Sequence, residues 1–487
     1  MVEDTLRHKT IKGVGWSAAD AFLGQGITFV VGLVLARLLS PEEYGLIGIC
    51  LIFTTILNGL VDSGFSNALI RKKYAADSDY NTMFITNLVI SLLLYVLLFF
   101  SAPASARFFA RVELVPLIRV MGLVLIANAL SITQSTILTK RLDFKTKTKA
   151  SLVSAIVSGV AGIAMAYAGC GVWAIVAQIL SKQILFTCCL WWFNRWWPDL
   201  TFSRDSFKYM WGFGSKLMLS GLLDNLWKQL YQVVVGKFYS PATLGQYSRS
   251  REYANLFSAN ITAVVQRVSY PALSEIQDDK ERMMAAYRRV IKMTMFVTCV
   301  LMISLGAVAE PMIYCLIGPK WHEAATYLPL ICLSMSMYPL HAINLNMLQL
   351  QGRSDLFLYL EVAKKIIGVI PILVGVLVNV YSMLLVNVFT GFIAFLLNSF
   401  FTGKKLGYSS WMQLKDVSAS YAVSFIVAGS MYFFKYLPVS YWIVLPLQIL
   451  VGFAVCLFVC EQVRLAEYLE IKRMAVNVFN RLRKRTE

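Results

Sequence analysis

Long apolar runs recur along the whole chain, and they constrain its fold more than any other feature. Of the 487 residues, 58% are hydrophobic and only 15% are charged, which is too little polar surface for a soluble protein of this length. Runs of about 20 apolar residues can cross the ~30 Å hydrocarbon core of a bilayer as helices that satisfy their own backbone hydrogen bonds. The sequence therefore predicts an all-α integral membrane protein with about fourteen transmembrane helices. The predicted spans cover residues 15–38, 43–66, 81–103, 114–138, 150–168, 171–193, 211–236, 245–266, 293–313, 325–350, 358–378, 381–402, 417–435 and 439–460.

The basic residues are distributed unevenly between these spans. Most of the 45 Lys and Arg residues fall in alternate connections and in the two terminal segments. Cytoplasmic loops of membrane proteins carry such an excess, so we expect a multi-pass protein with both termini cytoplasmic. The net charge of +18 then reports membrane orientation, and membrane lipids are the expected surroundings. No interleaved aromatic and basic motif indicates nucleic acid as a partner.

One short motif is written twice. Residues 34–45 read VLARLLSPEEYG, and residues 234–245 read VVGKFYSPATLG, so a basic residue, a Ser-Pro pair and a glycine recur in register. Parallel repeats are a common plan of membrane transporters, although Ser-Pro followed by Gly is also a turn that can arise independently. We favour duplication, which predicts a six-helix bundle in residues 1–200, a second in 201–402, and two further helices with a basic cytoplasmic tail in 403–487.

Several longer segments carry a family resemblance. They are GVGWSAADAFLGQGITFVVGLVLARLLSPEEYGLIGI, VDSGFSNALIRKK, ILTKRLDFKTKT, GCGVWAIVAQ, SYPALSEIQDDKERMMAAYRRVI, LIGPKW and LQGRSDL, in this order. Together they resemble the Wzx-type polysaccharide flippases, within the superfamily that includes multidrug exporters and the peptidoglycan-precursor flippase. The resemblance implies two six-helix bundles around a central cavity in the bacterial inner membrane.

The same resemblance implies a cargo and an activity. The cargo is a polyprenyl-pyrophosphate-linked glycan, moved from the inner to the outer leaflet for O-antigen, capsule or exopolysaccharide biosynthesis. Alternating access of the two bundles is the expected mechanism. An additional role as a scaffold for polysaccharide polymerase machinery stays open.

Ionisable residues inside the predicted spans are the candidate functional residues, because charge at bilayer depth is costly and faces a bundle interior or a wet cavity. For the phosphates of the cargo we expect four basic residues: Lys216, Lys228, Arg249 and Arg251. For ion coupling or charge pairing we expect three acidic residues: Asp20, Asp62 and Asp224. Lys228, Arg249 and Arg251 are predicted to form an outer layer, and Lys216, Asp20 and Asp62 an inner one. Local pairing of Asp224 with Lys228 and of Arg249 with Glu252 is the alternative.

Two other functions compete with lipid-linked sugar transport. A membrane glycosyltransferase would use a motif such as Asp77-Ser78-Asp79, but no connection is long enough for a nucleotide-sugar domain. A cation-coupled multidrug exporter on the same fold would use the acidic residues instead of the basic ones. The sequence predicts no enzyme, no metal site and no cofactor, and it leaves proton or sodium-ion coupling open.

Overall fold

The computed structural model describes residue 16 and residues 20–62, 64–199, 201–276, 278–350 and 354–486. These residues are helical, with short turns between helices and no β-strand among them. The chain forms two compact units, Met1–Gly245 and Gln246–Glu487. Each unit is described separately below.

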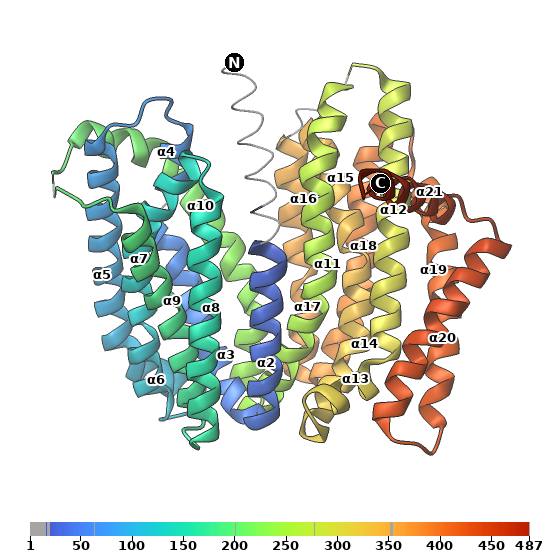
Figure 1. The fold of residues 1–487 in the computed structure, drawn as a ribbon, viewed down its shortest axis with the longest axis horizontal. Coiled ribbons are helices and arrows are strands. Elements are labelled where there is room, and N and C mark those ends of the chain that lie inside the picture. Colours follow the sequence, from blue (N-terminus) through green and yellow to red (C-terminus); the bar gives the residue numbers. More distant parts are fainter. Residues whose placement is uncertain are drawn as a thin grey trace. The chain divides into compact units, whose positions relative to one another are not determined.

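The first unit is a bundle in which neighbouring helices of the chain pack on one another (Figure 1). The helices α8 and α9 pack side by side, and α10 packs against α3, α4 and α5. The elements of this unit are η1 (Asp20–Gly24), α2 (Gln25–Leu38), α3 (Pro41–Asp62), α4 (Phe65–Arg71), α5 (Asp77–Phe109), α6 (Leu114–Met121), α7 (Leu123–Lys140), α8 (Phe144–Tyr167), α9 (Val172–Asn194) and α10 (Arg204–Phe238).

The second unit takes up α11, whose first residues belong to the first unit, and continues to the end of the chain. Two clusters of buried apolar side chains form its core, one centred on α12 and the other shared by α12, α19 and α20. The elements are α11 (Pro241–Glu275), α12 (Lys280–Ala307), α13 (Ala309–Leu316), η2 (Pro319–Trp321), α14 (His322–Ser336), α15 (Tyr338–Leu350), α16 (Ser354–Ile367), α17 (Val369–Leu377), α18 (Val380–Leu406), α19 (Ser410–Phe433), η3 (Phe434–Tyr436), α20 (Tyr441–Gln462) and α21 (Ala466–Thr486).

Ten helices or helix pairs in the described residues are long and apolar enough to cross a membrane. This confirms an all-α membrane protein, while the count of fourteen stays a prediction. The remaining predicted spans fall on helices that are shorter or more polar. Helix α2 has 14 residues, α10 and α11 carry the charged residues singled out above, and the helix break at Gly368 separates α16 from α17.

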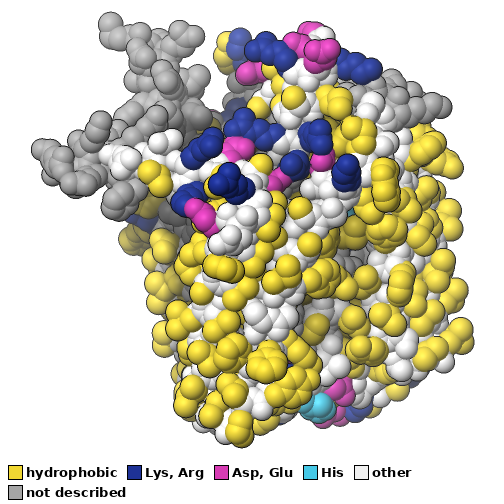
Figure 2. Space-filling view, turned by 90° about the vertical axis from the view of Figure 1, so that its right-hand side faces the viewer, with side chains coloured by type: hydrophobic (Ala, Val, Ile, Leu, Met, Phe, Trp, Pro, Cys, Tyr) yellow, Lys and Arg dark blue, Asp and Glu magenta, His cyan; other side chains and the backbone are white. Residues whose placement is uncertain are grey.

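Charged side chains gather at one end of the second unit. Figure 2 shows Lys, Arg, Asp and Glu concentrated there, with hydrophobic side chains over most of the remaining face. The helix α21 lies at this end, packed on α12 and α20. Two ion pairs fasten it to α12: Arg289 with Glu470, and Lys292 with Glu467 at 2.7 Å. An apolar band with charge at its end is the surface that a membrane-embedded helix bundle requires.

The two copies of the repeated motif both form helix starts. Ser40 caps α3 in a reciprocal box, in which its N–H and hydroxyl donate to the Glu43 carboxylate and its Oγ accepts from the Glu43 N–H at 3.3 Å. In the second copy, Ser240 Oγ accepts from the Thr243 N–H at 3.1 Å, at the start of α11. The repeated Ser-Pro pair is therefore a helix N-cap followed by proline at the first helical position.

The glycine of each copy packs against the proline of the other copy. A Cβ atom at Gly45 would lie 1.7 Å from the Pro241 carbonyl oxygen, and one at Gly245 would lie 2.0 Å from the Pro41 carbonyl oxygen. The first turns of α3 and α11 thus touch backbone to backbone, with each glycine providing the space. The two copies of the repeat therefore pack on each other reciprocally.

Candidate functional site

The predicted site residues divide between the two units. The first unit holds Asp20, Asp62, Lys216, Asp224 and Lys228, and the second holds Arg249 and Arg251. The inner layer of the sequence prediction lies within one unit, whereas the outer layer draws on both.

On α10, Lys216 is exposed and Asp224 and Lys228 form a local ion pair. Their Nζ and Oδ2 atoms are 2.5 Å apart, one helical turn along α10, and both side chains are at least half exposed. This is the local pairing that the sequence left as an alternative. An exposed pair of this kind contributes little to stability, so its carboxylate can yield to another anion.

On α11, the two arginines have different surroundings. Arg249 is only 7% exposed, and its Nη1 donates to Glu252 Oε2 at 2.8 Å. Arg251 is half-buried and interacts with the buried hydroxyl of Tyr247. Residues two apart on a helix point to different faces, so the pair does not act as one double-armed clamp.

Asp62 is the last residue of α3, and hydrogen bonds link it to two other helices. Its Oδ1 accepts from the Ser66 hydroxyl and from the Ser66 N–H, which lies in the first turn of α4. Thr136 of α7 donates in turn to Ser66 Oγ at 3.0 Å. Asp62 therefore holds the junction of α3, α4 and α7.

Asp20 lies in the single π-helical turn η1 and shares its surroundings with two lysines that the sequence prediction did not place there. Lys147, assigned from sequence to a cytoplasmic connection, lies in the first turn of α8, and Lys182 lies midway along α9. Both are half-buried and interact electrostatically with Asp20. A sequence signal for Lys147 existed: Asp143 caps α8 by accepting from the Thr146 N–H at 3.1 Å, which sets the helix start.

A chain of neutral polar side chains runs through the interior of the first unit. Asn128 donates to Asn58 Oδ1 at 2.9 Å, the Ser131 hydroxyl donates to the Asn128 carbonyl at 2.8 Å, and Gln183 donates to Ser131 at 3.2 Å. It links α3, α7 and α9. Sequence reasoning concentrated on charge and did not single out these residues.

The second unit holds a more closed polar network. Tyr287 donates to Asn344 Oδ1 at 2.9 Å, and Asn344 donates to Gln413 Oε1 at 3.0 Å, with all three side chains buried. Nearby, Tyr408 donates to Asp416 at 2.7 Å, and burial raises the pKa of the Tyr408 hydroxyl well above its usual value. This network joins α12, α15 and α19, and its members bind one another.

Asp79, of the Asp77-Ser78-Asp79 motif that could suggest a glycosyltransferase, has a structural role. Asp79 is 1% exposed, accepts from the Ala76 N–H at 2.9 Å, and pairs with Lys72 at 2.8 Å. It therefore closes the turn before α5. In the described part of the chain, no group of three His, Cys, Asp or Glu residues is placed to hold a metal ion.

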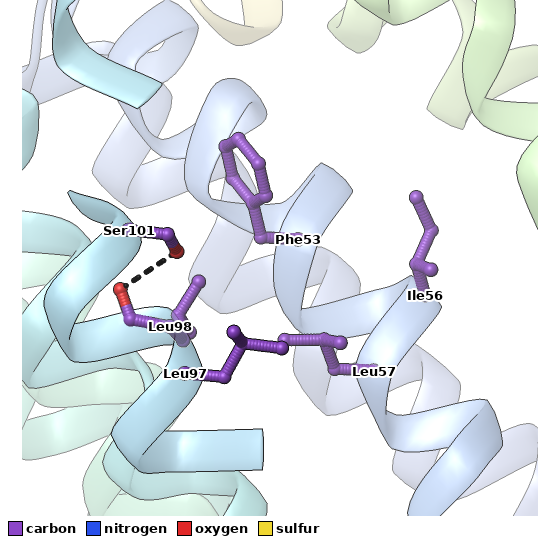
Figure 3. A pocket seen from close by; sticks show the side chains of 6 residues that line it. All are labelled: Phe53, Ile56, Leu57, Leu97, Leu98 and Ser101. Carbon is purple, nitrogen blue, oxygen red and sulfur yellow. Dashed lines mark hydrogen bonds between the residues drawn. The ribbon is translucent and has the colours of Figure 1, made fainter. Parts of the chain in front are cut away.

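A small cavity between α3 and α5 is unsuited to a charged or sugar cargo. It measures about 130 Å³ and is lined by Phe53, Ile56, Leu57, Leu97, Leu98 and Ser101 (Figure 3). The hydroxyl of Ser101 donates to the Leu98 carbonyl at 3.2 Å, so even this polar group is satisfied. The candidate site consists of the embedded charges, and this pocket is separate from them.

Curated relatives with known roles cover about two thirds or more of this chain. The succinoglycan biosynthesis transport protein ExoT of Rhizobium meliloti is 26% identical over 331 residues, which is 68% of this chain and 67% of the relative. The teichuronic acid biosynthesis protein TuaB of Bacillus subtilis is 24% identical, covering 73% and 74%. The lipopolysaccharide biosynthesis protein WzxC of Escherichia coli is 22% identical, covering 76% of each.

Solved structures share the fold. The lipid II flippase MurJ in an inward closed conformation matches 92% of this chain and 97% of its own, with a TM-score of 0.70 at 17% identity. A multidrug resistance MATE transporter in an inward-facing conformation matches 80% of this chain and 98% of its own, with a TM-score of 0.62 at 16% identity. Residues 34–326 match the family described as polysaccharide biosynthesis protein, so the resemblance found in the sequence is confirmed. The chain belongs to the polysaccharide biosynthesis protein family, a membrane protein with the fold of MurJ and MATE transporters.

Proposed function

We propose that this protein is a flippase that moves a polyprenyl-pyrophosphate-linked oligosaccharide from the inner to the outer leaflet of the bacterial inner membrane. The observation that carries the proposal is the family membership, whose relatives include a succinoglycan transport protein. The fold shared with a lipid II flippase supports it. Basic residues within the predicted membrane spans of α10 and α11 fit an anionic cargo better than a cationic one.

The energetics of the cargo are compatible with this role. A pyrophosphate carries about two negative charges, and each gains ~2.3 kcal/mol per 100 mV in moving outward from a negative cytoplasm. Desolvation of phosphates and sugars partway across is the remaining obstacle. Lys228, Arg249 and Arg251 would lower it by replacing water around the phosphates, and Asp224 would keep Lys228 from binding too tightly.

Two measurements test the proposal. A strain lacking the protein should accumulate lipid-linked oligosaccharide in the inner leaflet, and the purified protein in vesicles should restore its flipping. In the same vesicles, Lys228→Ala or Arg249→Ala should slow flipping, and Asp224→Asn should tighten binding and slow release. Lys208→Ala is the matched control, since Lys208 is exposed on the same helix as Lys228. Lys435 is a poorer control, because it pairs with Glu310 at 2.6 Å. Equal rates for Lys228→Ala, Arg249→Ala and the parent would exclude the outer phosphate layer.

For the transport cycle we propose rocking of residues 1–200 against 201–402. Spin labels near Arg37 and Lys237 flank the reciprocal glycine contact and should separate during a cycle. A label distance that stays constant while cargo is flipped would exclude this motion.

A cation-coupled multidrug exporter is the second candidate, favoured by the MATE-like fold and by Asp20 inside the first helix. Comparing the binding of a cationic dye with that of undecaprenyl pyrophosphate separates the two functions. Dye binding that depends on Asp20, without binding of the pyrophosphate lipid, would favour the exporter. A proton or sodium gradient imposed on the vesicles tests ion coupling.

A further inference from the structure

Asp20, Lys147 and Lys182 form a cluster, called here the Asp-Lys-Lys cluster, inside the first unit. They come from three elements that pack together: η1 with α8, and α8 with α9. Lys182 lies midway along an apolar helix, and Lys147 lies one turn in from the start of another. The cluster is thus embedded among predicted membrane spans and lies within a single unit.

The cluster has more positive than negative charge. In the described part of the chain, Asp20 is the one acidic side chain that acts on either lysine. A single carboxylate compensates one ammonium group, and a second ammonium group in a low-dielectric interior requires another anion or a large penalty. An anionic ligand would balance the cluster.

The polar atoms of the cluster retain hydrogen-bonding capacity. Asp20 Oδ1 is buried and has no hydrogen-bond partner among the described residues. Lys182 Nζ donates to Thr28 Oγ1 at 3.2 Å, which uses one of its three donors. Thr28 is itself fixed by donating to the Gly24 carbonyl at 2.9 Å. These groups are held in place and can still accept further partners.

Gly24 and Ser151 lie next to the Asp20 carboxylate. A Cβ atom at Gly24 would be in ordinary contact with both side chains, 3.5 Å from Asp20 Oδ1 and 3.7 Å from Ser151 Oγ, so the three residues line one wall of the cluster. The Ser151 hydroxyl, on α8, adds a further hydrogen-bonding group to this wall. Single π-helical turns are frequent at functional sites, because they re-aim side chains within a helix.

We propose that the Asp-Lys-Lys cluster binds the phosphate groups of a phosphorylated lipid, with Lys147 and Lys182 donating to the phosphate oxygens. This deepens the proposed function, on which it rests, by assigning the pyrophosphate end of the cargo to the first unit. In the absence of cargo, Asp20 offsets part of the positive charge of the two lysines. With cargo bound, the carboxylate repels the phosphates and keeps the affinity low enough for release.

The test uses the full-length protein in nanodiscs of phosphatidylcholine, with undecaprenyl pyrophosphate as the probe. Lys147→Ala and Lys182→Ala should each weaken binding about tenfold or more, as expected for loss of a charge-assisted hydrogen bond. Lys182→Arg, which keeps the charge, should restore most of the affinity. Asp20→Asn should tighten binding several-fold by removing the repulsion. Lys149→Ala is the matched control, because Lys149 lies two residues along the same helix and is exposed.

Competition experiments then show whether the bound phosphate belongs to the cargo or to a phospholipid headgroup. Inorganic pyrophosphate should compete with the probe, and phosphatidylglycerol should compete much less. Equal competition by phosphatidylglycerol would overturn the assignment to cargo and make this a phospholipid headgroup site. Unchanged binding in both lysine variants, at parental melting temperature, would overturn the site altogether.

The same experiment separates the site from the proposed function. Lysine-dependent binding of undecaprenyl pyrophosphate, in a protein that flips no lipid-linked oligosaccharide, would uphold the site and reject the flippase. Flipping that persists at the parental rate in Lys147→Ala and Lys182→Ala would uphold the flippase and reject the site. If either lysine variant melts early, Asp20→Asn decides instead: an affinity for the probe equal to that of the parent rejects the site.

Discussion

One cluster in each unit shows two different ways of compensating cations with carboxylates. In the second unit, Lys292 pairs with Glu467 at 2.7 Å, and Arg288 pairs with an Asp416 carboxylate that is 7% exposed. Each of these two cations has a carboxylate of its own. In the first unit Lys72 likewise pairs with Asp79 at 2.8 Å, whereas Lys147 and Lys182 both interact with the single carboxylate of Asp20.

The difference indicates which cluster carries positive charge that an anion could balance. A cation with its own buried carboxylate is already neutralised, and separating such a pair costs stability. A carboxylate shared by two lysines leaves charge that a ligand can balance. The ion pairs of the second unit therefore belong to its architecture, and the shared carboxylate of the first belongs to its proposed site.

Removing a cation from the second unit gives the largest expected effect. Lys292→Ala leaves Glu467, which is 5% exposed, without its partner. Breaking a buried pair costs about 3–5 kcal/mol, so the detergent-solubilised protein should melt well below the parent. Lys292→Met with Glu467→Leu, which removes both charges, should recover most of the loss. A melting temperature unchanged in Lys292→Ala would show that this ion pair does not stabilise the second unit, contrary to the comparison.

The second-largest loss of stability is expected for Gly45→Ala, because the repeated turns of the first unit are in close backbone contact. In Gly45→Ala the new methyl group meets the Pro241 carbonyl, and the helix starts must move apart. Overpacking of this kind costs about 1–3 kcal/mol. Gly212→Ala is the control, since nothing lies within 4 Å of a Cβ there, and it should be neutral or slightly stabilising. Equal thermal stability of both variants would contradict the contact.

Lys182→Ala should have a much smaller effect on stability than Lys292→Ala. It removes a hydrogen bond to Thr28 and leaves Lys147 as the one lysine of the cluster that interacts electrostatically with Asp20. The net cost is expected to be about 1 kcal/mol or less, because repulsion between the lysines disappears at the same time. Thermal melting in the same detergent gives the comparison. A loss as large as that of Lys292→Ala would make Lys182 a structural residue.

The smallest effect is expected at an exposed pair. Lys472 and Glu461 are 2.6 Å apart and about half exposed, and the hydrogen bond to Glu461 raises the pKa of Lys472. Exposed pairs contribute little to stability and are screened by salt, so Lys472→Ala should melt within error of the parent. A marked loss of stability that persists in high salt would show that α21 depends on this pair.

Much of the fold could be predicted from sequence because it rests on local patterns. The apolar runs located the membrane helices, and the Ser-Pro pairs marked the starts of α3 and α11. The local pairs of α10 and α11 were also foreseen as alternatives, because residues three or four apart on a helix are neighbours.

The rest of the candidate site depends on which helix faces pack together. Lys147 looked like one of several loop lysines until the cap at Asp143 and the packing of α8 on η1 turned it inward. Asn344 and Gln413 are far apart in sequence, and neither carries a charge that would draw attention to it. Hydropathy reports that a helix is buried in lipid or protein, and it does not say which polar groups meet inside.

The reciprocal glycine contact also constrains how the gene can change. Each copy of the turn supplies the space that the other copy's proline backbone fills, so neither copy can vary independently. With a larger residue at Gly45, the backbone at Pro241 would have to move away. In the same way, a larger residue at Gly245 would displace the backbone at Pro41. Insertion of an epitope or a fluorescent protein at either turn should fail for the same reason, however exposed the loop is. The two turns, although 200 residues apart in the sequence, therefore have to change together.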